Sequence, residues 1–359
     1  MPNKPATPNG NHPISPGKSV SQATRLAEFY NAFHHDDRVL VVITADPDSI
    51  ASAVALKRLL WRRVAHIHVA STNRVRRPDN LKLLSALALQ LPLLEEIDLE
   101  SFDKFVTVDS QPHHNDQMIK IPFSVVIDHH PLPATPPDPA PLFRDIRPEW
   151  GATASVMASY LKAARVKPNK TLATALFYAI KTDTQNFVRQ GQLEDMRAFR
   201  WLYPLIHQPL LSDIERAPIG LKSFEVIKRA LQATSINKQY AHAFVERLDH
   251  PDTLVIVADF LMQINAVNRS VVAGVYEDRL VVVMRSAGVR SNLGRLAAQA
   301  FGKYGSAGGH KNMARAEMPL EALDPKVASK AQTLNKFVLS CLSGVLSRKD
   351  KSGETKDKD

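Results

Sequence analysis

The sequence predicts a two-domain α/β protein, in which a Rossmann-like parallel sheet comes first, a smaller α/β domain follows, and a cleft lies between them. Strand-like and helix-like segments alternate through about the first half of the chain, which is the order found in parallel sheets covered by helices. A helical stretch follows, and after it a strand-rich unit with a hairpin signal. The 359 residues are enough for about two domains.

The first strand gives the clearest signal in the first domain, which we bound at residues 38–190. Arg38 to Thr44 (RVLVVIT) is rich in β-branched residues, as is typical of a strand buried on both faces. Further strands are predicted at 66–71, 105–108 and 123–127, and helices at 50–64, 81–91, 152–164 and 171–181. Six prolines from Pro131 to Pro141 indicate a loop.

The second domain is predicted at 237–346, after a helical connector at 191–236. Glu277-Asp278 lies between two apolar runs and indicates a hairpin. The expected strands are 241–247, 270–276, 279–284 and 314–318, and the expected helices are 292–301 and 326–346. Residues 1–37, with prolines recurring through the first sixteen, are expected to be a disordered tail, and 347–359 a charged tail.

The charge suggests a polyanionic partner. The net charge is +10 and the pI about 9.6, and no acidic residue occurs from Ser49 to Pro78. This stretch either contacts nucleic acid or forms a solvated helix face; its candidate contacts are Lys57, Arg58, Arg74, Arg76 and Arg77. The single cysteine, Cys341, excludes an intramolecular disulfide and a cysteine-cluster metal site. We expect a cytoplasmic location and no membrane association, because no run reaches the ~18 apolar residues of a membrane span.

Acidic residues and histidines gather where the strands of the first sheet should end. The carboxyl ends of the strands are the edge at which open parallel sheets bind ligands. The residues are Asp46 and Asp48 after the first strand, Asp109 after the strand at 105–108, Asp128-His129-His130 after the strand at 123–127, and Asp183 after a buried helix.

Carboxylates gathered in this way repel one another unless cations neutralise them. Oxygen ligands with one or two imidazoles suit Mn²⁺ or Mg²⁺, and two such ions ~3.5–4 Å apart can clamp a phosphoryl group and acidify a water. The alternative is that each Asp caps a helix or a turn, and for Asp48 alone this alternative is at least as good. It does not explain an Asp-His-His run directly after a buried strand.

Together these motifs resemble the DHH phosphoesterase superfamily over roughly residues 39–320. Asp128-His129-His130 matches the name-giving motif, and Ala51-Ser52-Ala53 after Asp48 fits the first motif. Gly308-Gly309-His310 and Arg285-Ser286 resemble signatures of the DHH-associated C-terminal domain. The superfamily includes RecJ exonucleases, oligoribonucleases, cyclic-dinucleotide phosphodiesterases and family II pyrophosphatases.

The resemblance implies a role for each matching residue. Asp109 would bridge two Mn²⁺ or Mg²⁺ ions, with Asp46 in the first site and Asp48, His129 and Asp183 in the second. Asp109, His129 and His130 would be the catalytic residues, His130 contacting phosphate and Asp128 orienting the histidines. Arg285, Ser286, Gly308, Gly309 and His310 would bind the distal part of the substrate. Residues 38–190 would then be the DHH catalytic domain and 237–346 the substrate-binding domain.

The sequence departs from the family at one metal ligand. The first motif begins with His four residues before the first Asp, and Val42 occupies that position. Val42 cannot coordinate a metal, so one of the two sites is expected to be weakened. His113 and His114 follow Asp109 at the correct edge of the sheet and are candidates for a substitute ligand; the alternative is that they are solvent-exposed loop histidines.

The function that these features predict is a metal-dependent phosphoesterase that hydrolyses short oligonucleotides or dinucleotides, including those derived from cyclic dinucleotides, by two-metal activation of water. The preference for short substrates comes from the resemblance. Two alternatives stay open: a catalytically degenerate nucleotide or nucleic-acid binder, which Val42 favours, and a hydrolase of phosphoanhydrides such as polyphosphate. A homodimer is also left open.

Overall fold

The computed structural model describes residues 21–132, 140–187, 192–287, 292–309 and 311–353, with side chains up to residue 344. The chain divides into two compact units, residues 1–217 and 218–359. Each unit has its own sheet and its own hydrophobic core. The cleft expected between the units stays a prediction.

The first unit is built on a five-stranded sheet that is parallel throughout. Its strands are β1 (Arg38–Ile43), β2 (His66–Ser71), β3 (Lys104–Val108), β4 (Phe123–Asp128) and β5 (Phe143–Ile146), in the order β2-β1-β3-β4-β5. The chain therefore reverses its direction of winding between β1 and β3. In doubly wound sheets, the carboxyl ends of the strands at such a switch point form the ligand-binding crevice.

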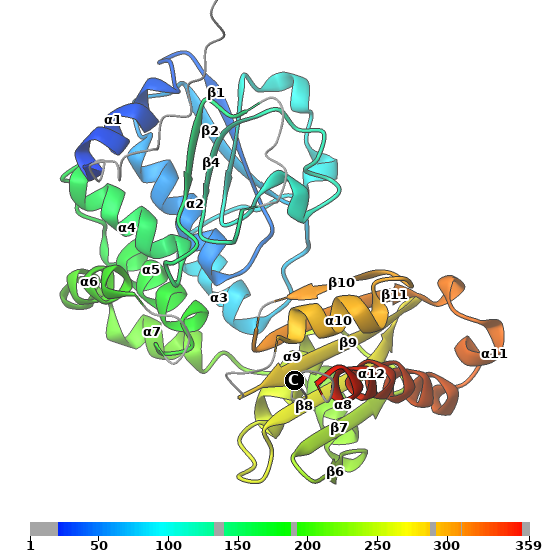
Figure 1. The fold of residues 1–359 in the computed structure, drawn as a ribbon. Helices are drawn as coiled ribbons and strands as arrows, with labels where there is room; N and C mark the ends of the chain where they lie inside the picture. Colours follow the sequence, from blue (N-terminus) through cyan, green and yellow to red (C-terminus); the bar gives the residue numbers. More distant parts are fainter. Residues whose placement is uncertain (1–20, 133–139, 188–191, 288–291, 310, 354–359) are drawn as a thin grey trace, which may run out of the picture. The chain divides into compact units, whose positions relative to one another are not determined.

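Apolar side chains of β1 alternate between two cores, which is why the strand is hydrophobic throughout. Val39, Val41 and Ile43 pack under helices, whereas Leu40 and Val42 face a smaller core on the other side. The helices are α1 (Gln22–Asn31), α2 (Pro47–Leu59), α3 (Pro78–Ala86), α4 (Thr153–Ala163), α5 (Lys170–Asp183), α6 (Leu193–Leu202) and α7 (Gln208–Glu215). Figure 1 shows α1, α2, α4 and α5 together on one side of the sheet.

The second unit has a six-stranded mixed sheet in the order β10-β11-β9-β8-β7-β6. Only β7 and β8 pair in parallel, and β8 and β9 form the predicted hairpin around Glu277-Asp278. The strands are β6 (Ser235–Asn237), β7 (Tyr240–Val245), β8 (Arg269–Tyr276), β9 (Arg279–Ser286), β10 (Ser306–Gly309) and β11 (Met313–Pro319).

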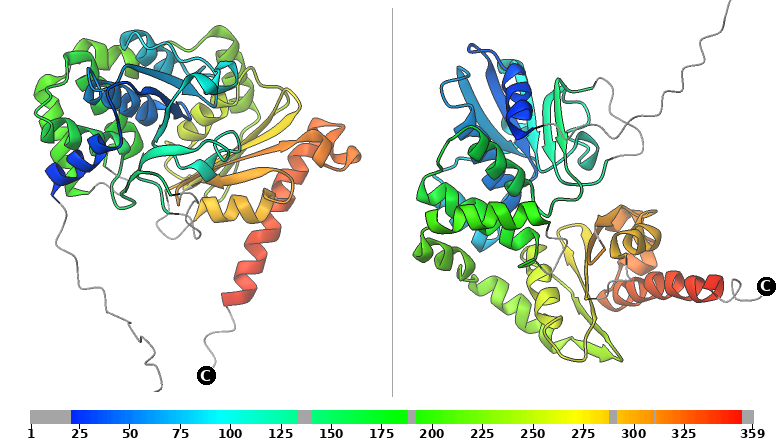
Figure 2. Two further views of the ribbon diagram at one scale, coloured as in Figure 1. Left: turned by 90° about the horizontal axis from the view of Figure 1, so that it is seen from above. Right: turned by 60° about the vertical axis from the view of Figure 1, so that its left-hand side comes forward.

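Helices cover both faces of this second sheet. Helices α8 (Leu221–Gln232) and α9 (Asp252–Leu261) bury one face. The other face packs against α10 (Leu293–Phe301) and α12 (Ala331–Gly353), which follows the short α11 (Pro325–Ala328). The right-hand view of Figure 2 shows α8 and the red helix α12 on opposite sides of the strands.

The prediction that residues 1–37 are a disordered tail is wrong from Ser21 onward. Ser21 caps α1, whose Phe29 is 1% exposed and contacts the rings of Phe143 and Tyr160. Arg25 on the same helix forms an ion pair with the buried Asp145 at 2.8 Å. The prolines that suggested disorder lie outside the described residues, and the amphipathic helix begins after them.

The predicted connector at 191–236 is not a separate element. Helices α6 and α7 contribute Ala198, Leu202, Leu211 and Ile214 to the core of the first unit, and α8 belongs to the second unit. Helix α12 continues to Gly353, into the stretch 347–359 that is expected to be a charged tail. In the part of the chain that the structure describes, no helix is long and apolar enough to cross a membrane.

Candidate metal centre

The predicted acidic and histidine residues lie at the carboxyl edge of the first sheet. Asp46 and Asp48 follow β1, Asp109 follows β3, and Asp128 is the last residue of β4. Asp183 reaches the same edge from the last position of α5. The site therefore forms at the switch point between β1 and β3, with β4 beside it.

His129 belongs to two groups of candidate ligands. Among the described residues, ligand atoms of Asp48, His129 and Asp183 lie within 4.8 Å of one another, and so do those of Asp109, His129 and His130. His129 Nε2 is 3.1 Å from Asp183 Oδ2 and 3.5 Å from Asp109 Oδ1. Asp46 belongs to neither group.

The ring of His129 is oriented by the backbone. Its Nδ1 lies 3.1 Å from the carbonyl oxygen of Trp150, and because a carbonyl only accepts, Nδ1 carries the proton. Nε2 is therefore the atom that faces the carboxylates. Burial lowers the pKa of His129, but the hydrogen bond and charge of Asp183, together with the charge of Asp48, raise it to about 10. In the metal-free protein at neutral pH, an imidazolium balances part of the negative charge.

Asp109 is held in place by both its backbone and its side chain. Its φ of 59° lies in the left-handed region, which Asp tolerates better than most residues. Its N–H donates to Ile127 O at 2.9 Å, and the hydroxyl of Thr153 donates to Oδ1 at 2.9 Å. Burial and the charges of Asp48 and other nearby carboxylates raise its pKa well above the ordinary value.

Asp48 is both a helix cap and a candidate ligand. Its two oxygens accept the N–H groups of Thr153 and Ala154, each at 2.7 Å, at the start of α4. Helix α4 has no side-chain cap of its own, so Asp48 serves it from α2. Burial and the charge of Asp183 nevertheless raise the pKa of Asp48 to about 7.

Asp46 fits the capping alternative more directly. It caps α2 by accepting the N–H of Ser49 at 2.8 Å, and the Ser49 hydroxyl accepts the N–H of Asp46 at 3.0 Å. Its charge is felt by Asp48 and Asp109. Asp46 is thus close to the centre, but its role as a metal ligand stays a prediction.

Asp128 orients the second histidine of the motif. It is fully buried and accepts from His130 Nδ1 at 2.8 Å and from the Gln111 side-chain amide at 2.7 Å. Burial raises the pKa of Asp128. The hydrogen bonds from His130 and Gln111 and the charge of His130 outweigh this effect, so the pKa lies below its usual range. A permanently ionised Asp128 holds the His130 proton on Nδ1, which leaves Nε2 as the other ring nitrogen.

Val42 is fully buried in the smaller core beside Leu40, so it offers nothing to the site. His114 does reach it: ligand atoms of His114, Asp128 and His130 lie within 4.8 Å of one another. His114 Nδ1 accepts the Gln111 N–H at 3.1 Å, so the neutral ring carries its proton on Nε2. Burial and the charge of His130 lower the pKa of His114 to about 4. His113 is exposed.

The predicted substrate-binding residues of the second unit meet at one end of its sheet. Arg285 and Ser286 end β9, Gly308 and Gly309 end β10, and β11 lies between these strands. Gly309 has a φ of +139°, and a Cβ there would lie 2.4 Å from Met313 O, whereas a Cβ on Gly308 would point into open space. Arg285 Nε donates to Asp259 at 2.6 Å. His310 lies outside the described residues.

The basic side chains between Ser49 and Pro78 lie in two different environments. Arg77 forms two hydrogen bonds to Asp79, which also accepts from Tyr178, so this arginine contributes to the fold. Lys57 and Arg58 instead line a cavity near the end of α2.

Sequence reasoning did not identify three residues that support the site: Thr153, Gln111 and Trp150, which contact Asp109, Asp128 and His129 respectively. Gln111 and Trp150 lie in loops, and the contact of Trp150 is made by its backbone. The only signal for Thr153 is its position at the start of a helix, which does not reveal a partner 44 residues away.

Comparisons with known proteins agree with this arrangement. The N-terminal domain model of the DHH family matches residues 38–180, and the DHHA1 domain model matches residues 237–343. An uncharacterised protein of Methanocaldococcus jannaschii is 32% identical over 302 residues, which are 84% of this chain and 61% of that protein. The chain thus spans less than two thirds of that relative.

Two solved structures share the fold. An exopolyphosphatase-related protein from Bacteroides fragilis is similar with a TM-score of 0.68 at 18% identity, covering 90% of this chain and 99% of that one. The exonuclease RecJ bound to manganese is similar with a TM-score of 0.50 at 15% identity, covering 91% and 96%. With two family domains in the expected order and an Asp-His-His motif at the carboxyl edge of a parallel sheet, the chain belongs to the DHH phosphoesterase superfamily.

Proposed function

We propose that this protein is a metal-dependent phosphodiesterase that acts on short oligonucleotides or dinucleotides. The observation that carries the proposal is the position of His129. Its Nδ1 proton is committed to a backbone carbonyl, and its Nε2 is directed at the carboxylates of Asp183 and Asp109.

The residues present fit a divalent cation. Several buried carboxylates raise one another's pKa values here, and only a proton or a cation removes that repulsion. Oxygen ligands with an imidazole suit Mn²⁺ or Mg²⁺. Asp48, Asp109, His129 and Asp183 would hold one ion. A bound ion would supply Lewis acidity toward a phosphoryl oxygen and would lower the pKa of water.

The second ion would have one protein ligand fewer, because Val42 offers none. Asp46 and Asp109 would hold this ion, together with the imidazole of His129 or His130, whose ligand atoms lie close to that of Asp109. His114 fits a different role, because a neutral ring with its proton on Nε2 donates a hydrogen bond. It would bind a phosphoryl oxygen, so we expect it to act on substrate and not on metal.

In the second unit, Arg285, Ser286 and the Gly308-Gly309 backbone would bind the far end of the substrate. Gly308 suits a close approach by an anion, because nothing lies within 4 Å of where its Cβ would be. Arg285 would have to share its guanidinium with Asp259. A terminal phosphate is the group that these residues fit best.

Two alternatives each have an observation in their favour. The exopolyphosphatase-related protein from Bacteroides fragilis shares the fold, which keeps phosphoanhydride hydrolysis in view. The loss of the first-motif histidine at Val42 favours a protein that binds nucleotides without hydrolysing them.

One assay separates the three functions. The metal-stripped protein is incubated with Mn²⁺ and either a 5′-phosphorylated dinucleotide, a linear polyphosphate or pyrophosphate, and released mononucleotide or phosphate is quantified. We expect mononucleotide release that the Asp109→Asn variant abolishes. Phosphate release from polyphosphate alone would replace the proposed function with the phosphoanhydride alternative. Dinucleotide binding without turnover of any substrate would show a binding protein.

A further inference from the structure

A cavity of about 1060 Å³ lies in the first unit, away from the carboxylate cluster. Its walls come from the end of α2, the start of β2 at His66, the end of α3 and the loop before α5. Helix α2 begins beside the candidate metal centre and ends at this cavity, and its 13 residues extend about 20 Å. The cavity is therefore a separate place on the molecule, at the amino edge of the sheet.

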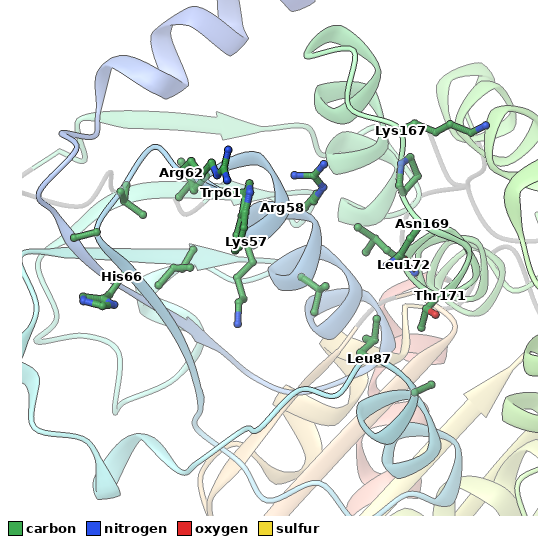
Figure 3. Close-up of a pocket in the computed structure, with 17 residues that line it drawn as sticks. Lys57, Arg58, Trp61, Arg62, His66, Leu87, Lys167, Asn169, Thr171 and Leu172 are labelled. Carbon is green, nitrogen blue, oxygen red and sulfur yellow. Dashed lines mark hydrogen bonds between the residues drawn. The ribbon is translucent and has the colours of Figure 1, made fainter.

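The cavity is strongly basic. Lys57, Arg58, Arg62 and Lys167 line it, and its 17 lining residues include no Asp or Glu. Within the described part of the chain, none of these four cations forms an ion pair. Figure 3 shows Lys57 and Arg58 extending from the last turns of α2, with Lys167 and Asn169 on the facing loop. Like charges gathered in this way favour a polyanion.

An aromatic side chain lies among these cations. Trp61 lines the cavity and is 65% exposed, whereas its neighbour Leu60 is fully buried. Arg62 follows with a φ of 62°, a backbone conformation that is uncommon for Arg. An exposed indole flanked by unpaired cations combines a surface on which a base can stack with contacts for the phosphate backbone.

The start of α5 adds a further group that favours anions. Asn169, Thr171 and Leu172 line the cavity, and Asn169 caps this 14-residue helix by accepting the Leu172 N–H. The N-terminus of a helix carries a partial positive charge and attracts phosphate. An acidic protein segment could also pair with these cations, but it would not require an exposed aromatic ring such as that of Trp61 among them.

We propose that this cavity binds nucleotide units of single-stranded nucleic acid, with phosphates on Arg58, Arg62 and Lys167 and a base on Trp61. The site is additional to the proposed catalytic one and does not depend on turnover. It would hold a strand at a second point, so that affinity increases with strand length beyond a dinucleotide.

The test is fluorescence anisotropy of a labelled single-stranded oligonucleotide about ten nucleotides long, titrated with the full protein in EDTA so that no hydrolysis occurs. We expect Trp61→Ala to weaken binding about 5- to 150-fold. We expect Arg58→Gln/Lys167→Gln to lower the slope of log affinity against log salt by about 1.4, because each lost phosphate contact on a single strand contributes about 0.7.

The matched control is Lys120→Gln/Arg144→Gln, which removes one Lys and one Arg from exposed positions of the same unit; it should bind like the native protein. Equal affinities in all variants would overturn the proposal. A second pair of results would also overturn it: polyphosphate competes as well as the unlabelled oligonucleotide, and Trp61→Ala has no effect. Charge alone would then explain binding. An acidic peptide that binds more tightly than the oligonucleotide would assign the cavity to a protein partner. Because the assay needs no activity, it is independent of the proposed catalysis.

Discussion

Metal binding at this centre should release protons, because His129 has to give up its Nε2 proton to become a ligand. In the metal-free protein, the pKa of His129 is raised to about 10 by its hydrogen bond to Asp183 and by nearby carboxylate charges, which outweigh the effect of burial. The ring is therefore an imidazolium at neutral pH. A divalent ion replaces that proton as the neutralising charge, so its apparent affinity depends on pH.

The size of the effect follows from the pKa of His129. The difference between about 10 and pH 7 is about three units, which corresponds to roughly 4 kcal/mol at 1.36 kcal/mol per unit. Apparent affinity at pH 7 should thus be about 1000-fold below its high-pH limit and should rise about tenfold per pH unit. Asp48, with a pKa raised to about 7 by burial and the charge of Asp183, adds part of a second proton near neutrality.

The assay is calorimetric titration of Mn²⁺ into EDTA-dialysed protein, from about pH 6.5 to 8.5, in paired buffers that differ in ionisation enthalpy. At least one proton per bound ion should appear in the buffer near pH 7. The His129→Asn variant should release about one proton fewer. An affinity that is independent of pH, with no proton released, would refute the assignment of Nε2 as a ligand.

The remaining predictions concern stability. Without metal, the melting temperature should fall as pH rises from about 6.5 to 9. The pKa of His129 is higher in the folded than in the unfolded protein, so protonated His129 stabilises the fold fully below the unfolded-state pKa. This stabilisation is lost as the pH rises toward the folded-state pKa of about 10. Differential scanning fluorimetry in EDTA checks this, and a rising melting temperature would contradict it. Asp145→Asn should cost roughly 3–5 kcal/mol in urea denaturation, because it leaves the mostly buried guanidinium of Arg147 without its carboxylate; an unchanged midpoint would disprove that role. Gly294→Ala should lower the melting temperature, since its Cβ would lie 2.1 Å from a backbone oxygen of β10, whereas Gly220→Ala, with nothing within 4 Å, should leave it unchanged.

The elements predicted well from the sequence are those whose signal is local. The β-branched run of β1 reads as a buried strand because both of its faces pack into cores, and the β8–β9 hairpin has its turn residues between two apolar runs. Two strands that were missed have weak local signals, whereas α9 was missed although its sequence is strongly apolar. Strand β5 (FRDI) is a short edge strand with two charged residues, and β10 (SAGG) has residues with low strand propensity.

In the candidate site too, features with a local sequence signal can be predicted and contacts between distant residues cannot. Strand-end carboxylates can be found from the sequence because parallel strands bring their carboxyl ends to one edge. Contacts between distant residues cannot be found in this way: Asp48 caps α4 across 105 residues of chain, and Gln111 holds Asp128 from a loop. The proton positions on His129 and His114 also depend on backbone partners that no motif specifies.

The most direct test of the metal centre is a crystal of the protein soaked in Mn²⁺ and measured for anomalous scattering. A peak within bonding distance of His129 Nε2 and of the carboxylates of Asp109 and Asp183 is the predicted result. Clear density for His129 with no anomalous peak beside it, or a peak bound only elsewhere on the protein, would contradict it.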